Sequence, residues 1–256
     1  MGKASYFNQL DDLRARIAGI AGPHHRGRGV LSLGVPMIDA ALPGGGLALG
    51  ALHEVAGAGA DVEHGAAAAL FAAGVLARTR GPVLWVSARQ DLFGPGLAAG
   101  GLDADRVLHV EAGRAVLDAM EEGLRLGCPG GVVGEVEGRF GLTPSRRLQL
   151  AAEASGVVAF AIRRSRVHDD PALAAPSAAV TRWRIACLPS VPPLPQAPSV
   201  PGLGRARWRL DLLRARGGAP SSWIVEAGDA PDHLRLVAGL ADGQAAAEPG
   251  TRRAAC

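Results

Sequence analysis

Short apolar runs alternate with longer stretches of helical periodicity between residues 31 and 162. The predicted strands are residues 52–55, 83–87, 107–110, 132–136 and 157–162. The predicted helices between them are residues 64–80, residues 114–126 and a third helix with Thr143 as its N-cap and Pro144 as its first residue. Strands that alternate with helices predict an α/β fold in three layers, in which a mostly parallel sheet lies between helices.

The pattern changes after residue 163, where polar and apolar residues alternate with the period of two that is typical of half-exposed strands. This alternation covers residues 181–187 and 205–214, and it predicts an antiparallel C-terminal extension of the sheet. Residues 188–204 between them hold six prolines, which excludes a helix or a central strand. We expect a semi-rigid surface loop, with a peptide ligand for another protein as the alternative.

Both ends of the chain differ from its middle part. One apolar stripe on a short N-terminal amphipathic helix is formed by Tyr6, Leu10, Leu13, Ile17 and Ile20. That helix packs either on its own domain or on a partner, for which Leu10, Leu13 and Ile17 are the candidate contacts. After residue 225 the chain becomes rich in Ala, Gly, Asp and Pro, and roughly its last dozen residues have too little apolar content to fold alone. The expected organisation is a helix and linker in residues 1–29, a core in residues 30–227 and a flexible tail in residues 228–256.

Composition narrows the functional classes. With 256 residues and 48% hydrophobic residues the chain can bury one substantial core, and its net charge of +3 is too small to imply a nucleic-acid partner. Its three cysteines have no C-x-x-C spacing, so we expect neither a metal site nor a disulfide framework. Because the sequence shows no signal peptide and no run of about 18 apolar residues, we expect a cytoplasmic protein without membrane contact.

The most specific stretch is residues 31–57, LSLGVPMIDAALPGGGLALGALHEVAG, which resembles the start of the ATPase core of RecA-family recombinases. In those proteins a phosphate-binding loop follows directly. Its glycine N–H groups surround the phosphates, a lysine neutralises their charge and a hydroxyl group holds Mg²⁺. Here the loop position reads GAGADVEHG, in which Gly57 is the first glycine and Gly59 the next.

The decisive positions of this loop are changed. Val62 stands at the second glycine of the motif, Glu63 at the lysine and His64 at the hydroxyl residue. No shift of the alignment supplies the lysine, because Lys3 is the only one in the chain. A carboxylate close to a triphosphate is repulsive, so Glu63 opposes nucleotide binding.

A second catalytic position is changed as well. Arg89 stands where the recombinases have the glutamate that activates the attacking water, and a cation cannot act as that base. Glu135 and Glu137 end a later strand near the position of a magnesium-holding aspartate. The simpler interpretation of Glu135 is a strand-end residue that is paired with an arginine. We therefore predict that the chain is not an enzyme and uses no cofactor.

Several longer segments are similar to the ImuA family. They are residues 31–57, PVLWVSARQDLFGPGLAAGGL, GVVGEVEGRFGLTPSRRLQLAAEASGVVAFAIR, TRWRIACLPS and GLGRARWRLDLLRARGGAPSSW. The resemblance implies a RecA-like fold without a working phosphate-binding loop and a role in a damage-induced mutagenesis cassette. It also implies two partners, the polymerase-like protein ImuB and an error-prone DnaE-type polymerase, with RecA as a further candidate.

Arginines mark the candidate contact surfaces. In two predicted strands they alternate with apolar residues, so that Arg182, Arg184, Arg207 and Arg209 are expected to share one face. Further candidates are Arg146, Arg147, Arg163 and Arg164. Such arginines recognise the phosphates of DNA or the carboxylates of an acidic partner, and the sequence does not separate the two.

Three functional hypotheses follow. The leading one is a non-catalytic adaptor in translesion DNA synthesis. The second is a recombinase-like DNA-binding ATPase, which would need a cation from elsewhere to replace the absent lysine. The third is a cell-division inhibitor of the SulA kind, against which the TRWR and GLGRARWRL segments speak.

Overall fold

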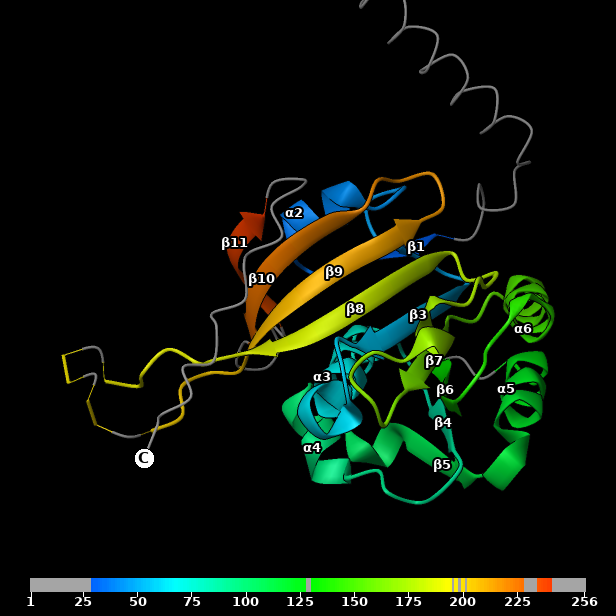
Figure 1. The fold of residues 1–256 in the computed structure, drawn as a ribbon. Coiled ribbons are helices and arrows are strands. Elements are labelled where there is room, and N and C mark those ends of the chain that lie inside the picture. Colours follow the sequence, from blue (N-terminus) through cyan, green and yellow to red (C-terminus); the bar gives the residue numbers. More distant parts are fainter. Residues whose placement is uncertain are drawn as a thin grey trace, which may run out of the picture.

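The computed structural model describes residues 29–240 except 128–129, 195, 198, 201 and 228–233. Within this part of the chain, nine strands form one sheet in the order β11-β10-β9-β8-β3-β7-β6-β4-β5 (Figure 1). The parallel part is β3 (Leu52–Gly57), β4 (Val83–Ser87), β5 (Val107–Glu111), β6 (Gly131–Glu137), β7 (Ala159–Arg164) and β8 (Thr181–Leu188). The antiparallel extension adds β9 (Arg207–Ala215), β10 (Ser221–Ala227) and β11 (Leu234–Leu240).

Helices cover both faces of the parallel part. Short α2 (Pro36–Ala41), long α3 (Asp61–Leu76) and short α4 (Gly94–Ala99) contribute to the cluster on one face. The other face is covered by α5 (Val116–Arg125) and α6 (Leu142–Ser155). A small ribbon of β1 (Val30–Leu31) and β2 (Leu47–Ala48) precedes β3. The fold is therefore a three-layer α/β fold with a mostly parallel sheet and an antiparallel extension, as predicted.

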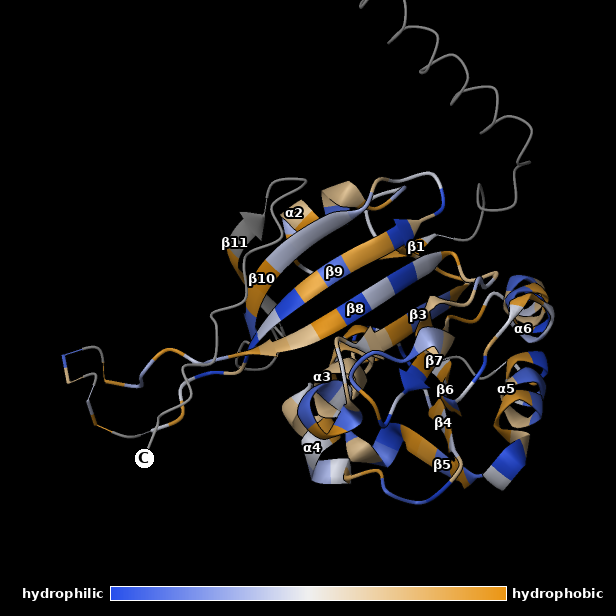
Figure 2. Ribbon diagram, viewed as in Figure 1, coloured by the Kyte–Doolittle hydropathy of each residue, from blue (hydrophilic) through white to orange (hydrophobic). Residues whose placement is uncertain are grey.

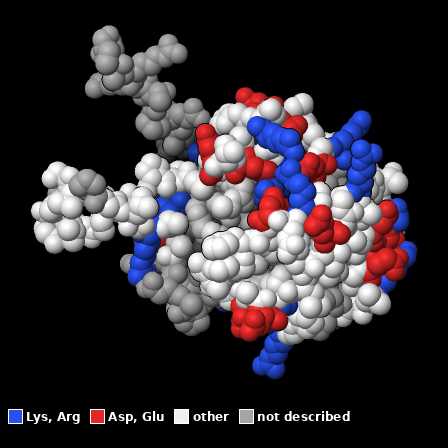
Figure 3. Space-filling model, turned by 90° about the horizontal axis from the view of Figure 1, so that it is seen from below, with Lys and Arg blue, Asp and Glu red and all other residues white. Residues whose placement is uncertain are grey.

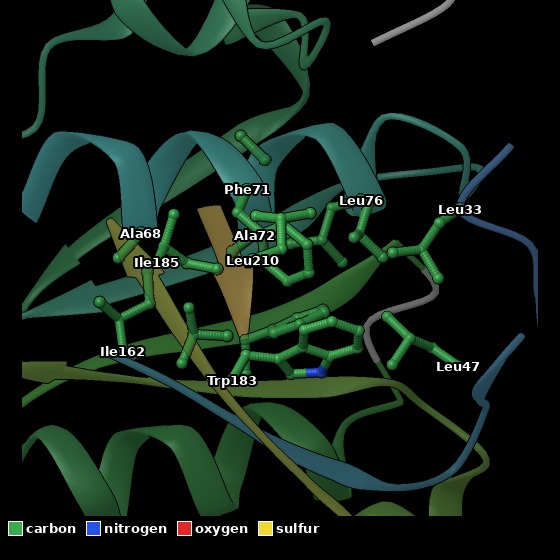
Figure 4. Packing of buried hydrophobic residues seen from close by; sticks show 14 of the residues in the cluster. Leu33, Leu47, Ala68, Phe71, Ala72, Leu76, Ile162, Trp183, Ile185 and Leu210 are labelled. Carbon is green, nitrogen blue, oxygen red and sulfur yellow. The ribbon is translucent and has the colours of Figure 1, made fainter. Parts of the chain in front are cut away.

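The larger core lies between α3 and the sheet. Trp183 of β8 is fully buried, and its ring centroid lies 5.2 Å from that of Phe71 and 6.1 Å from that of Trp223. Figure 4 shows how side chains of α3 meet Trp183, Ile185 and Leu210 from the sheet. In Figure 2 the ribbons of β8 and β9 alternate between hydrophilic and hydrophobic residues, because only one face of these strands is buried against this core.

One predicted helix start is wrong. The third helix begins at Leu142 with Gly141 as its N-cap, so Thr143 lies inside the first turn and makes no side-chain cap. The first-turn N–H groups of any helix lack intrahelical acceptors, and a proline is therefore tolerated at the third helical position, where Pro144 lies, as well as at the first. The sequence pattern did not show whether Pro144 is the first or the third residue of the helix.

The sheet also extends beyond the predicted core boundary at residue 227. Strand β11 pairs antiparallel with β10, so part of the predicted flexible tail belongs to the sheet. Residues 241–256 of that tail lie outside the described residues, as do the predicted N-terminal helix and its Leu10, Leu13 and Ile17. In residues 29–240, as far as the structure describes them, no helix is long and apolar enough to cross a membrane.

Candidate functional site: the carboxyl edge of the parallel strands

The connection from β3 to α3 lies where the resemblance places a phosphate-binding loop. Only residues 58–60 separate the end of the strand at Gly57 from the start of the helix at Asp61. A Cβ atom added to Gly57 would lie 2.8 Å from the Cβ of His64, and one added to Gly59 would lie 2.6 Å from the Nδ1 of His168. The chain's own side chains therefore fill the space beside both glycines.

Hydrogen bonds hold this connection closed. The N–H of Asp61, at the start of α3, donates to the carbonyl oxygen of Ser165 at 2.8 Å. His64 turns inward, where its Nδ1 accepts a hydrogen bond of 3.1 Å from the N–H of Cys187 in β8. An anion-binding helix start needs N–H groups that are free to face a ligand. Here the leading N–H group already has an acceptor within the protein.

The first turn of α3 is also acidic, since it carries Asp61 and Glu63. The Val62 residue is 94% exposed and the Glu63 side chain is 61% exposed, so neither packs into the connection. Carboxylates at a helix start interact favourably with the positive end of its dipole, which is the role that a phosphate has in nucleotide-binding proteins. The chain thus supplies its own anions at this end of the helix.

Arg164, at the end of β7, lies among three carboxylates that come from different elements. Its Nε is 3.0 Å from the Oδ2 of Asp61, its NH1 is 3.6 Å from the Oε2 of Glu135 and its NH2 is 4.0 Å from the Oδ2 of Asp91. Glu135 also accepts a hydrogen bond of 2.8 Å from the indole N–H of Trp85. This agrees with the simpler interpretation of Glu135 as an arginine-paired strand-end residue.

Arg89 lies at the same edge, after β4, and its NH2 is 3.8 Å from the Oε1 of Glu137. The hollow between Arg89, Arg164, Glu135 and Glu137 has a volume of about 10 Å³. That is room for roughly one water molecule, whereas ligand pockets usually measure roughly 300–1,000 Å³. Side chains and ion pairs therefore occupy the edge at the ends of β4, β6 and β7.

Burial raises the pKa of two carboxyl groups at this edge. The pKa of Asp61 is raised above its ordinary value chiefly by desolvation, against the opposing effect of the Arg164 charge. Desolvation likewise raises the pKa of Glu135, and both the Arg164 charge and the hydrogen bond from Trp85 oppose it. Arg164 therefore helps to keep these buried carboxylates ionised, and it is bound to the protein rather than offered to a ligand.

Arg163, the preceding residue, was a candidate for DNA contact, and its position contradicts that prediction. Its side chain is 1% exposed, and its NH1 donates to the Oε1 of Glu54 at 2.7 Å. Its NH2 donates to the carbonyl oxygens of Gly138 at 2.7 Å and Ala172 at 3.2 Å. Because side chains alternate along a strand, Arg163 points into the protein while Arg164 points to the edge.

Glu54 of β3 is the centre of this buried cluster, and sequence reasoning missed it. Its Oε2 accepts from the hydroxyl of Ser177 at 2.5 Å and from the NH2 of Arg182 at 3.1 Å. The cluster ties the segment between β7 and β8 to the sheet. A signal was present, because Glu54 is a charged residue within the apolar run LHEVAG, and a buried charge requires a partner.

Four predicted surface arginines do share one face of β8 and β9, opposite the core. Each is paired with a carboxylate of the same chain: Arg182 with Glu54, Arg184 and Arg209 with Asp211, and Arg207 with Glu226. A cleft of about 510 Å³ is lined by residues of this face and of the β3–α3 connection, including Arg182, Arg184, Gly57 and Ala58, together with the acidic Asp169 and Asp170. A contact of these arginines with DNA or an acidic protein stays a prediction.

The remaining candidates lie on α6, away from the β8–β9 face. Both Arg146 and Arg147 are exposed, and Arg147 is ion-paired with Glu121 and lies 3.7 Å from the Oδ1 of Asp118, both on α5. The face seen in Figure 3 has basic and acidic side chains close together. No group of three or more His, Cys, Asp or Glu side chains in the described part of the chain is arranged to hold a metal ion.

Comparison with known proteins gives relatives in sequence and in structure. The chain is 44% identical over 237 residues to "Protein ImuA" of two Caulobacter vibrioides strains, with 88% of this chain and 95% of the relative covered. No protein-family model matches the chain.

Among solved structures, the crystal structure of the RadB recombinase is similar to the fold. The TM-score is 0.54 with 14% sequence identity, and the match covers 77% of this chain and 96% of RadB. This likeness establishes a RecA-like architecture for the chain and nothing about its activity.

Proposed function

The chain belongs to the ImuA family, and from this membership and the closed β3–α3 connection we propose that it is a non-catalytic accessory protein of damage-induced translesion DNA synthesis. It acts through protein contacts with an ImuB-type polymerase-like protein and, directly or through that protein, with an error-prone DnaE-type polymerase. RecA is a further candidate partner. Its working compartment is the cytoplasm.

The observation that carries the proposal is the state of the carboxyl edge. A RecA-like ATPase needs a glycine loop with free N–H groups, a lysine on the phosphates and a carboxylate base. Here the leading N–H group of α3 is bound to Ser165, Glu63 replaces the lysine and Arg89 replaces the base. The RecA-like core is retained as a scaffold, and its surfaces supply the function.

The competing function is a recombinase-like ATPase, and it requires a cation that replaces the missing lysine. Arg164 lies beside the start of α3, where its Nε is 3.0 Å from the Oδ2 of Asp61, but three carboxylates already surround it. Moving it to a phosphate would leave buried Glu135 without its cation, which is costly for a desolvated carboxylate. This observation favours the accessory role.

A calorimetric titration of the full chain with its cognate ImuB-type protein tests the proposal. We expect a complex with a Kd of about 1 μM or tighter in nucleotide-free buffer, because no nucleotide-dependent state is needed. The same Kd is expected after addition of ATP and Mg²⁺. The matched control is the ImuB-type protein titrated with heat-unfolded chain.

Two outcomes would overturn the proposal. The first is no binding by the full-length chain in either buffer. The second is a complex that forms only with ATP and Mg²⁺, since a nucleotide-gated contact belongs to the recombinase-like hypothesis.

A further inference from the structure

The segment between β8 and β9, residues 189–204, is here called the arm. It contains six prolines and no charged residue in PSVPPLPQAPSVPGLG. Surface loops of soluble proteins are usually polar, because their side chains face water. The arm differs from such loops because it has no charged residue, although the two strands that it connects carry several.

The arm projects from the body of the molecule. In Figure 1 it extends beyond the ends of β8 and β9, and in Figure 3 it forms an uncharged lobe beside the main body. Its base is fixed by the pairing of Leu188 with Arg207 across the two strands. A projecting segment with a fixed base is presented to other molecules instead of covering its own core.

Internal contacts join the described residues of the arm. The N–H of Gly204 donates to the hydroxyl oxygen of Ser190 at 3.2 Å, and a Cβ atom on Gly202 would lie 2.7 Å from the Cγ of Pro193. At the tip, the N–H of Ala197 donates to the carbonyl oxygen of Leu194 at 3.0 Å. The two sides of the arm therefore lie against each other, and glycine permits their close approach.

Aliphatic side chains are displayed along the arm. Val191 is 47% exposed, Leu194 is 42% exposed, Val200 is 45% exposed and Leu203 is 94% exposed. Single exposed aliphatic residues are common, but four of them on one short projecting segment favour a protein interaction site. These four side chains are the contact residues of the arm.

We infer that the arm is a docking element that binds an apolar, aromatic-lined groove on a partner protein. Proline fixes the backbone torsion φ, so a proline-rich segment loses little conformational entropy when it binds. Aromatic-lined grooves recognise such segments by packing against prolines and the aliphatic residues between them. The composition and the exposed aliphatic residues of the arm match both requirements.

A second copy of this chain is a poor occupant for the arm. Of the aromatic rings of Phe, Trp and Tyr in the described part of the chain, only Phe93 is among the exposed residues, at 70%. The described tryptophans are all buried. The described surface therefore offers no groove lined by several aromatic rings, and the partner is a different protein.

A membrane surface fits the arm no better. The arm contains no Trp, Tyr or Phe and no Lys or Arg, which are the residues that anchor a segment at a lipid interface. At its base, Arg184 and Arg209 share the single carboxylate of Asp211, which leaves one positive charge uncompensated in this group. We expect an acidic rim beside the partner's groove.

This inference rests on the proposed function, because the ImuB-type protein is the probe. The test compares the full chain with an arm variant that carries Val191→Ser, Leu194→Ser, Val200→Ser and Leu203→Ser. The matched control carries Leu108→Ser, Leu126→Ser and Leu142→Ser, which change aliphatic side chains that are 55%, 85% and 57% exposed on the core. Urea unfolding of all three proteins verifies that each is folded.

The arm variant is expected to bind the ImuB-type protein at least about tenfold more weakly than the full chain, as is typical when central contact residues are removed. The control is expected to bind with unchanged Kd. A synthetic peptide of residues 188–204 is expected to compete with the full chain for the ImuB-type protein.

Each other outcome contradicts the inference in a recognisable way. If the arm variant binds as tightly as the full chain, the arm is not the docking element and the accessory role stands. If the full chain itself does not bind, the proposed function fails and the inference fails with it. If the control loses as much affinity as the arm variant, the contact is unspecific. If the arm variant instead abolishes self-association in sedimentation, the occupant is a second copy.

Discussion

Replacing Glu54 by alanine is expected to lower the free energy of unfolding by about 3–5 kcal/mol, the usual cost of removing one partner from a buried ion pair. The Glu54 side chain is 2% exposed and that of Arg163 is 1% exposed, so water does not replace the lost carboxylate. Arg182 loses the same partner. Two guanidinium groups would then lie close together without the anion between them.

Urea unfolding at equilibrium measures this change. Glu63→Ala is the matched control, because its side chain is 61% exposed and a surface substitution is expected to change stability by at most about 0.5 kcal/mol. The segment between β7 and β8, which the cluster holds through Ser177 and Ala172, is expected to exchange its amide hydrogens faster in Glu54→Ala. A Glu54→Ala protein as stable as the control would show that the cluster contributes little.

Replacing Trp183 by alanine is expected to cost about 3–5 kcal/mol, the range for removing a large aromatic side chain from a core. Trp183 is fully buried and lies between Phe71 of α3 and Trp223 of β10, and its indole N–H donates to the Oγ1 of Thr181 at 2.9 Å. It is the side chain through which the long helix contacts both the parallel part of the sheet and its antiparallel extension. Its removal leaves a cavity that several elements line.

The same urea titration measures this change, and two further variants are compared with Trp183→Ala. Trp183→Phe keeps most of the apolar volume and is expected to lose clearly less stability than Trp183→Ala. Leu213→Ala, on β9, removes a side chain that is 41% exposed and is expected to change stability by at most about 0.5 kcal/mol. Equal losses for Trp183→Ala and Leu213→Ala would contradict the place given to Trp183 in the core.

The fold could be predicted because its pattern is local. Strands such as Val83–Ser87 are short apolar runs bounded by turn residues, and the two-residue period of β8 is visible in TRWRIACL. Strand β11 was missed although its sequence LRLVAGL is rich in large aliphatic residues, because the Ala-, Gly- and Asp-rich residues around it make the whole segment resemble a tail. It pairs antiparallel with β10, the strand directly before it in the chain, and this pairing makes it part of the sheet.

The site was predictable only in part. The loss of the lysine at Glu63 is readable from the sequence, since it depends on residue identity alone. The location of each arginine is not readable from the sequence. Arg163 and Arg164 are adjacent in sequence, yet Arg163 lies in a buried cluster and Arg164 at the sheet edge. Which arginine is neutralised depends on Glu54, Asp61 and Asp211, and these are brought to them only by the folded chain.

Whether this RecA-like chain works without a nucleotide is tested by titrating ATP with Mg²⁺ into the full-length chain in a calorimeter while released phosphate is measured. The closed β3–α3 connection predicts no saturable heat up to about 1 mM ATP, a concentration that corresponds to about 4 kcal/mol of binding free energy, and phosphate release no faster than in buffer. Saturable binding with a Kd of about 0.1 mM or tighter, together with phosphate release above the buffer rate, would contradict the account.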